Sequence, residues 1–210
     1  MDRRLKPDDT GLADSPPPAP PESLAELPIG EQIRDLRKAR DLTIAELARR
    51  IGRSVGYVSQ IERNLSAVSI SVLQQIAGAL GVQVSWFFQG NAVAPEDERD
   101  FIVRRGNRRR LQFDGGAVVE ELLSPNLRGR LELVLTTFRP GGQTGDTDRV
   151  RKGEEAGLVL SGTLEILVES RRFTLEAGDS FAFRNAGRHR CRNPGRIDAT
   201  VLWVHTPPSY

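Results

Sequence analysis

A polar trio, Ser59, Gln60 and Arg63, has the side-chain chemistry for contacts with DNA. A hydroxyl and an amide hydrogen-bond to base edges, and a guanidinium pairs with phosphate. At helical spacing Val58 and Ile61 share the face that would turn toward a core, so the trio falls on the other faces of the same helix. The trio therefore predicts a DNA-contacting helix, provided that neighbouring elements hold it in place.

Two short amphipathic helices joined by a tight turn would position this trio. Thr43 and Glu46 form a capping box at the start of the first helix. Apolar residues follow at helical spacing: Leu47, Ala48 and Ile51. Gly52 comes where that helix should stop, because glycine enters the left-handed region at low cost, and Ser54 can cap the next helix. This order of signals predicts a helix-turn-helix, the geometry that places a helix in a DNA groove.

The flanking segments supply the rest of a small helical bundle. A basic helix, EQIRDLRKARD, precedes the pair, and a helix capped by Ser69 and closed by Gly81 follows it. The segment VSWFF predicts a final short helix that seals the core. Five short helices within about sixty residues are enough for an independent helical domain.

The segment Ile29–Phe88 resembles the Cro/repressor-like helix-turn-helix family, also called the Xre type. The resemblance rests on LRKARDLTIAELARRIGRSVGYVSQIERN and the following SVLQQIAGALGV. It implies that residues 54–63 form the recognition helix. The positions it places at base edges are Val55, Gly56, Ser59 and Gln60, and those it places near phosphates are Arg53, Ser54 and Arg63. It also implies an ion pair between Arg37 and Glu62 that ties the first helix to the third.

From Phe101 onward the pattern changes to short runs rich in Val, Leu, Ile, Phe and Thr, separated by Gly, Pro and Asn. The runs include FIVRR, LQF, AVVEELL, LELVLTTF, TLEILVE and DATVLWVH. Many short strands with regular turns predict an antiparallel sandwich or barrel. The expected fold class is therefore α plus all-β in two domains, a five-helix lambda-repressor-like bundle followed by a β-barrel.

Two glycine-centred blocks in this region resemble the two motifs of the cupin family. The match is carried by the GEE segment at 153–155, the EAGD turn at 176–179 and the spacing of His189 and Asn193. The resemblance covers roughly residues 101–205 and implies a double-stranded β-helix, or jelly-roll barrel. With the helical segment in front, the layout looks like the cupin-containing Xre-type bacterial regulators, a group that includes repressors of polyamine catabolism.

A polar spot inside the barrel is the expected binding site for a small-molecule effector. Alternation in the strand RHRCRN puts His189 and Cys191 on the inner face and the arginines outside. The expected effector-binding residues are Arg151, Glu155, His189 and Cys191, within apolar walls. The alternatives are a hydrogen-bonded core histidine at 189, a structural ion pair between Arg151 and Glu155, and a packed thiol at 191. Nearby acids favour an amine effector and nearby arginines a carboxylate, so the effector stays open.

A metal site is not expected. The chain has two histidines, His189 and His205, and a metal site needs at least three convergent ligands. Arg151 stands where the cupin family has a metal-ligating histidine, and a guanidinium cannot ligate a metal. We therefore predict that the protein has no catalytic residue and no cofactor. The expected function is that of a transcription regulator, and a repressor is preferred. The alternatives are a metal-dependent cupin enzyme with an appended helix-turn-helix, and a constitutive DNA-binding module whose barrel only dimerises.

Length and composition set the remaining expectations. The 210 residues carry a net charge of +2, and residues 29–90 hold eight Lys or Arg against five Asp or Glu. The expected divisions are a disordered proline-rich tail (1–27), the DNA-binding domain (28–90), a linker (91–100) and the cupin sensor (101–210). A single cysteine and no apolar leader or spanning segment predict a cytoplasmic protein away from membranes. We expect a homodimer on an inverted-repeat operator in double-stranded DNA, because palindromic half-sites mirror two-fold symmetry.

Overall fold

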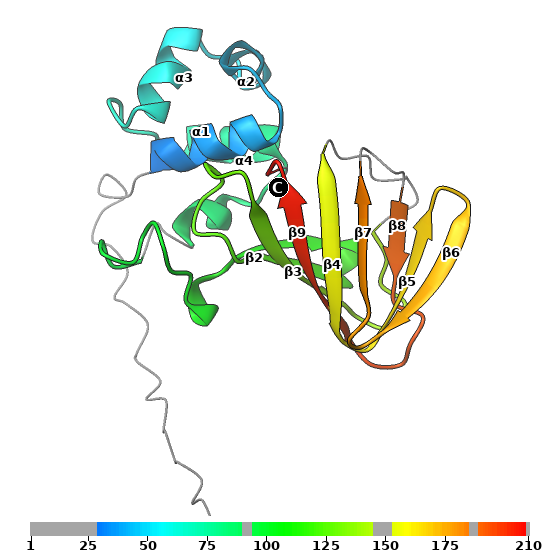
Figure 1. The fold of residues 1–210 in the computed structure, drawn as a ribbon. Coiled ribbons are helices and arrows are strands. Elements are labelled where there is room, and N and C mark those ends of the chain that lie inside the picture. Colours follow the sequence, from blue (N-terminus) through cyan, green and yellow to red (C-terminus); the bar gives the residue numbers. More distant parts are fainter. Residues whose placement is uncertain (1–28, 90–93, 145–152, 185–188, 209–210) are drawn as a thin grey trace, which may run out of the picture.

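The computed structural model describes residues 29–89, 94–144, 153–184 and 189–208. They form a helical part followed by a β-sheet part, and the helices gather at one end of the strands (Figure 1). None of the helices in these ranges is both long and apolar enough to cross a lipid bilayer.

Four α-helices make up the helical part: α1 (Ile29–Ala39), α2 (Ile44–Arg50), α3 (Val55–Glu62) and α4 (Ile70–Leu80). The last three each begin at a hydroxyl that accepts a hydrogen bond from the amide three residues on; these caps are Thr43, Ser54 and Ser69. Glu46 completes the capping box by accepting from the Thr43 amide at 2.7 Å. α4 ends at Gly81, whose φ of 72° lies in the left-handed region. The helix starts read from the sequence are therefore those of the structure.

The expected count of five helices is wrong, because the segment VSWFF does not form an α-helix. It forms a five-residue 3-10 helix, η2 (Val84–Phe88), and Gln83 before it makes no side-chain capping hydrogen bond. Valine and aromatic residues also lose side-chain freedom in an α-helix. A segment of only five residues therefore remains a 3-10 helix. Its Trp86 and Phe87 nevertheless close the core of the bundle, at 1% and 0% exposed.

Nine strands form the β-sheet part of the described chain. They are β1 (Arg109–Phe113), β2 (Val118–Leu122), β3 (Glu132–Phe138), β4 (Glu154–Ser161), β5 (Thr163–Val168), β6 (Arg171–Glu176), β7 (Ser180–Arg184), β8 (His189–Arg192) and β9 (Ala199–Thr206). All pairs are antiparallel, in a six-stranded sheet β1-β2-β3-β9-β4-β7 and a three-stranded sheet β6-β5-β8. The predicted antiparallel, cupin-like β-domain behind a helical domain is confirmed.

Strand alternation fills the space between the two sheets. β3 and β9 alternate buried and half-buried residues along their whole length, and their register pairs Val134 with Trp203 and Phe138 with Ala199. Leu164 of β5 is also fully buried. The inner faces of the large sheet therefore carry both the apolar core and the polar side chains described below.

The prediction that FIVRR forms the first strand is wrong. Its first two residues, Phe101 and Ile102, donate their amides to the carbonyl of Glu98 in a turn, and Arg104 forms an ion pair with the Glu98 side chain. Phe101 is 79% exposed, so no apolar face was available to hold the segment in a sheet. The next residues form the short 3-10 helix η4 (Arg105–Asn107), and the first strand begins only at Arg109.

Two arginines of the β-sheet part reach α1. Arg109 of β1 is buried, donates to Gln32 at 2.6 Å and lies 4.4 Å over the Trp86 ring. Arg128, in the loop between β2 and β3, donates to Asp35 at 3.1 Å and to Glu31 at 2.8 Å. This loop approaches α1 in Figure 1. The two parts of the chain are therefore joined by directed polar contacts as well as by the covalent linker.

Candidate functional site

The helix α3, which together with the residues at its two ends holds the positions expected to contact DNA, lies on the side of the helical part that faces away from the strands (Figure 1). Of these residues, six are exposed and Ser59 is half-buried; the exposed ones are Arg53, Ser54, Val55, Gly56, Gln60 and Arg63. The opposite side of α3 is buried through Val58 and Ile61. An exposed polar edge on a helix anchored by apolar residues is the form that a groove-reading helix takes.

Local contacts hold several of these side chains in place. The Ser54 hydroxyl accepts from the Tyr57 amide at 3.1 Å, so it caps α3 and its remaining lone pair and proton can serve a second partner. Arg63 donates its Nε to the Ser59 carbonyl at 3.2 Å, which leaves the outer guanidinium nitrogens directed elsewhere. Arg53 lies 5.9 Å over the Tyr57 ring. These contacts reduce the rotamer freedom that two of the arginines would lose on binding a partner.

A buried ion pair fixes α3 against α1. Arg37 donates its Nε and Nη2 to the two carboxylate oxygens of Glu62, at 2.6 and 2.9 Å, and its Nη1 to the Leu42 carbonyl at 2.7 Å. The Gly30 amide donates to the Asn64 side chain at 2.8 Å, at the other end of α1. A bidentate arginine–carboxylate contact is directional, so it sets the angle between the two helices as well as their distance.

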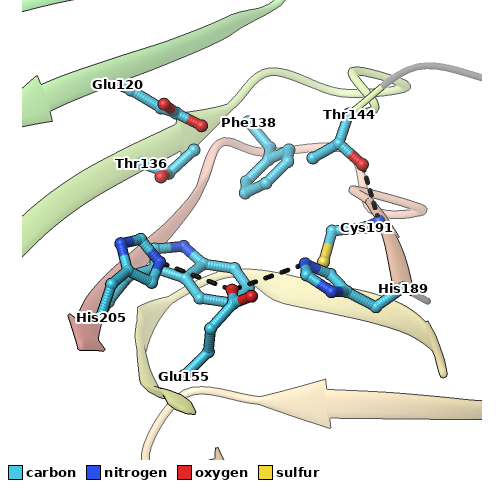
Figure 2. A pocket seen from close by; sticks show the side chains of 9 residues that line it. Glu120, Thr136, Phe138, Thr144, Glu155, His189, Cys191 and His205 are labelled. Atoms are coloured by element: carbon cyan, nitrogen blue, oxygen red, sulfur yellow. Dashed lines mark hydrogen bonds and ion pairs between the residues drawn. The ribbon is translucent and has the colours of Figure 1, made fainter. Parts of the chain in front are cut away.

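A small cavity lies inside the β-sheet part, between the large sheet and β8. Its lining combines two carboxylates, two imidazoles, a thiol, two hydroxyls and two aromatic rings, contributed by Glu120, Thr136, Phe138, Thr144, Glu155, His189, Cys191, Trp203 and His205. Figure 2 shows the carboxylates of Glu120 and Glu155 and both imidazoles turned toward this common space. The cavity is therefore polar at its centre, unlike the apolar core around it.

Glu155 stands between the two histidines. Its Oε2 lies 3.8 Å from His189 Nε2 and 3.6 Å from His205 Nε2, drawn as dashed lines in Figure 2. The other ring nitrogen of His205, Nδ1, lies 3.5 Å from an oxygen of Glu132, which is fully buried. These four side chains thus form an alternating row of carboxylates and imidazoles, Glu132, His205, Glu155 and His189.

Aromatic rings wall this row. Trp203 lies 6.1 Å from the His189 ring and 5.9 Å from the His205 ring, and Phe181 packs edge-on against Trp203 at 4.9 Å. Phe183 lies 4.8 Å from the His189 ring. The rings exclude water and lower the local dielectric, so charges in the row interact more strongly than they would at the surface.

The cavity is much smaller than a typical ligand pocket. Its volume is about 10 Å³, room for roughly one water molecule. A drug-sized ligand occupies a pocket of about 300–1,000 Å³. Between the described lining residues, the space at the row therefore fits a small polar head group.

Three of the four residues predicted to bind an effector line this one cavity: Glu155, His189 and Cys191. Arg151 lies outside the described residues. Asn193, two residues beyond Cys191, is fully buried and bonds to backbone groups, including the Phe138 carbonyl at 2.9 Å, so it shapes the barrel instead.

The first strands also contribute to the cavity and to the row beside it, which the sequence motifs did not predict. Glu120 lies on β2, and Glu132 and Thr136 lie on β3. All three occupy the alternate positions of their strands whose side chains are buried. The available signal was the period itself, because in LELVLTTF the positions Glu132, Val134 and Thr136 share the face of Phe138. An acid on the inner face of an apolar strand indicates a polar site.

The described side chains do not form a metal centre. Within residues 29–89, 94–144, 153–184 and 189–208, no three His, Cys, Asp or Glu side chains converge as metal ligands do. Both histidine Nε2 atoms are directed at the same oxygen of Glu155, so a cation bound between them would have to displace these contacts.

Comparison with known proteins assigns both parts of the chain. Residues 33–87 match the helix-turn-helix family HTH_3, and residues 134–205 match the cupin domain family Cupin_2. The HTH-type transcriptional regulator PuuR of Escherichia coli (strain K12) is 24% identical over 185 residues, covering 86% of this chain and 96% of PuuR. The immunity repressor protein of Bacillus phage phi105 is 36% identical over 73 residues, covering 35% of this chain and 51% of the repressor.

A solved enzyme structure also aligns with the chain. Hydroxypropylphosphonic acid epoxidase from S. wedmorenis is 19% identical with a TM-score of 0.42, covering 86% of this chain and 97% of the epoxidase. A likeness of that size carries no conclusion about activity. The chain therefore joins a segment of the helix-turn-helix family HTH_3 to a C-terminal segment of the cupin domain family, in the order that its sequence motifs predicted.

Proposed function

We propose that the protein is a transcription regulator whose helix-turn-helix domain binds an operator and whose cupin domain binds a small-molecule effector. The observation that carries the proposal is the exposed edge of α3, capped by Ser54 and held on α1 by the buried Arg37–Glu62 pair. A helix fixed in this way can enter a groove without reorganising. The similar proteins named as a transcriptional regulator and a repressor support the same function.

On DNA we assign two kinds of contact to the residues around α3. Gln60 and Ser59 read base edges by hydrogen bonds, while Val55 and Gly56 allow close apolar approach to thymine methyl groups. Three residues contact phosphates: Arg53, Ser54 and Arg63. We expect a homodimer on an inverted repeat, acting as a repressor in the cytoplasm, because one small domain covers too little DNA for tight specific binding.

For the effector, the charges of the cavity favour a small organic cation. Glu120 and Glu155 line the cavity, Glu132 backs His205, and the described lining contains no Lys or Arg side chain. A protonated amine would place a water-sized ammonium group among these carboxylates and donate hydrogen bonds to them. The rest of such a molecule would follow the aromatic wall around Trp203, where a cation also gains from the ring face.

A thermal-shift screen tests the effector assignment. Small amines should raise the melting temperature of the protein, because a ligand at about 100 times its Kd stabilises the folded state by about 2.7 kcal/mol, and matched carboxylic acids should not. Glu155→Gln should remove the shift, while Glu154→Gln, the exposed neighbour on β4, should keep it. A shift caused by carboxylates alone would move the effector to the opposite chemical class.

Selection of duplexes from random DNA by the purified protein tests the DNA function independently of any effector. We expect recovery of an inverted repeat whose half-sites lie about one helical turn, or a multiple of it, apart. Recovery of no preferred sequence would contradict the regulator assignment and leave the barrel as the only functional unit.

A further inference from the structure

The helical domain and the barrel meet through one set of polar contacts, which we call the interdomain clamp: Arg109 and Arg128 on the barrel, and Glu31, Gln32 and Asp35 on α1. Arg109 donates to Gln32 at 2.6 Å, and Arg128 donates to Asp35 at 3.1 Å and Glu31 at 2.8 Å. All three acceptors lie on one helix. The barrel therefore holds the helical domain by α1, and Arg109 also stacks on Trp86 of η2.

The same helix holds α3 from its other side. Arg37 binds Glu62 of α3 through two hydrogen bonds, and the Gly30 amide binds Asn64 just beyond the end of α3. A shift of α1 imposed by the barrel would be passed to α3 by these short, directional bonds, because packed helices move as rigid bodies rather than deforming continuously.

On the barrel side, both arginines of the clamp are close in the chain to the cavity residue Glu120. Arg109 is in β1, which pairs with β2 in a register that sets Arg109 opposite Leu122 and Leu111 opposite Glu120. Arg128 is in the loop that follows β2. β1 is an edge strand bound only to β2 within its sheet, so it must follow any movement of β2. A change at Glu120 therefore reaches both arginines through one strand.

The strength of the interdomain clamp depends on the exact positions of its buried charged groups. Arg109 is a charged side chain at 3% exposure, stacked on Trp86 at 4.4 Å, and burying a charge costs free energy that an apolar residue of similar size would not. Burial raises the pKa of Asp35, although Arg128 beside it lowers that pKa in part. Such a contact responds to small displacements, because lost hydrogen bonds would leave buried charges unpaired.

We propose that Arg109 and Arg128 are positioning residues for DNA binding, which transmit the state of the barrel cavity to the recognition helix through α1. The inference rests on the proposed regulator function. It adds the residues that link the two domains. It also adds the order in which a structural change is transmitted, from Glu120 through β2 and β1 to α1 and α3.

A mutational cycle on the full chain tests this link without any effector. Glu120→Gln removes the charge at the cavity and keeps the side-chain shape. Its effect on the Kd for the duplex selected by the wild-type protein is measured in the wild-type background and in the Arg128→Ala background. We expect a change of about fivefold or more in the first and almost none in the second, as for two sites coupled through a common element. Arg109→Met, which keeps the aliphatic stem, repeats the cycle at the buried half of the clamp.

The matched control is Glu121→Gln, on the same strand. Glu121 points to the opposite face of β2 and pairs with Arg108 and Arg110, outside the cavity and the clamp. It should leave the Kd unchanged in every background. Melting temperature shows that each variant is folded, and Arg128, whose side chain is 43% exposed, can be truncated without opening a core.

A second readout separates failure of the clamp from failure of the proposed function. Amide hydrogen exchange of α1 and α3 needs neither DNA nor effector, and Glu120→Gln should change it only while the clamp is intact. If selection recovers no DNA, the exchange result still decides the link. Equal effects of Glu120→Gln with and without the clamp, no effect of Glu120→Gln in the wild type, or equal effects of the two glutamate substitutions would each overturn the proposal.

Discussion

At the scale of single residues, Gln60 and Arg63 separate the two kinds of contact that α3 can make with DNA. Both are exposed and lie three positions apart, Gln60 in the last turn of α3 and Arg63 directly after it. An amide can form a paired hydrogen bond to one base, whereas a guanidinium near the backbone attracts phosphate of any sequence. Their substitutions should therefore differ in specificity as well as in affinity.

Gln60→Ala should weaken binding to the selected operator by about 1–3 kcal/mol and leave binding to random DNA unchanged. Arg63→Ala should weaken both and lower the slope of log K against log salt by about one phosphate contact. Titrations over a range of salt concentrations measure both quantities. Gln75→Ala, an exposed glutamine on α4, is the control. If Gln60→Ala kept the full operator preference, the reading residues would have to be assigned to another edge.

The row of carboxylates and imidazoles in the barrel should function without a transition metal. Elemental analysis should find no stoichiometric metal in the purified protein, and the response of operator binding to an amine that stabilises it should survive a chelator. Two protein ligands in family positions, Glu155 and His189, rarely hold zinc or iron tightly. Glu155→Gln should weaken the response and keep operator affinity. One metal per chain, lost together with the response, would favour a metal-dependent function.

Much of the cavity and of the row beside it was predictable from the sequence, because local periodicity fixes which side chains point inward. Glu155, His189 and Cys191 are found together because alternation fixes which face of a strand each occupies. Glu120 and Glu132 were not found, since neither lies in a cupin motif and a glutamate in a strand is more often solvent-facing. Which strands become neighbours is decided by packing across the whole barrel, and that information is spread along the chain.

At the scale of elements, the contact between α1 and α3 depends on Gly30 having no side chain. A Cβ at this position would overlap the carbonyl oxygen of Ile61 and lie 2.6 Å from the Asn64 side chain. The two helices can approach this closely only at a glycine, and the approach brings the Gly30 amide to Asn64.

Gly30→Ala should destabilise the helical domain by about 1–3 kcal/mol, because the clash is with backbone and the helices must separate. Gly78→Ala on α4 is the matched control: it adds the same methyl group to an exposed helical glycine with nothing within 4 Å. It should stabilise by about 0.4–1 kcal/mol through the unfolded state. Urea unfolding followed by circular dichroism measures both. Similar effects of the two substitutions would show that the close approach of α1 and α3 contributes nothing.

The elements that the sequence predicted well are those with explicit end signals. Thr43, Ser54 and Ser69 cap their helices as expected, because a capping hydroxyl acts within three residues. VSWFF and FIVRR were assigned wrongly, since their apolar composition fits several structures and only tertiary contacts choose among them.

At the scale of the whole molecule, we expect two copies to act together on one operator. Sedimentation should give a dimer, and a footprint should show two protected half-sites related by symmetry, because a single helical domain contacts only one. Placing an extra half-turn of DNA between the half-sites should lower affinity about a hundredfold or more, to the level of one half-site with nonspecific contacts. A footprint of one monomer on an asymmetric site would contradict the dimer.

The joint between the two domains was beyond sequence reasoning. Arg109 and Gln32 are 77 positions apart, and no local pattern in the sequence links them. The neighbours of Arg109, Arg108 and Arg110, pair with Glu121 at or near the surface, while Arg109 alternates inward to Trp86. Alternation predicts that one of three arginines turns the other way, but not that another domain lies there to receive it.

The small volume of the barrel cavity has a consequence for the kinetics of the regulator. Since about 10 Å³ between the described lining residues admits roughly one water, we expect a larger molecule to bind fully only when lining side chains such as Trp203 move. Stopped-flow mixing with a stabilising amine, followed by tryptophan fluorescence, should then show a rate that rises with concentration and levels off at the opening rate. Escape would meet the same barrier. A regulator built in this way keeps its response for a time set by the protein after the surrounding concentration has fallen.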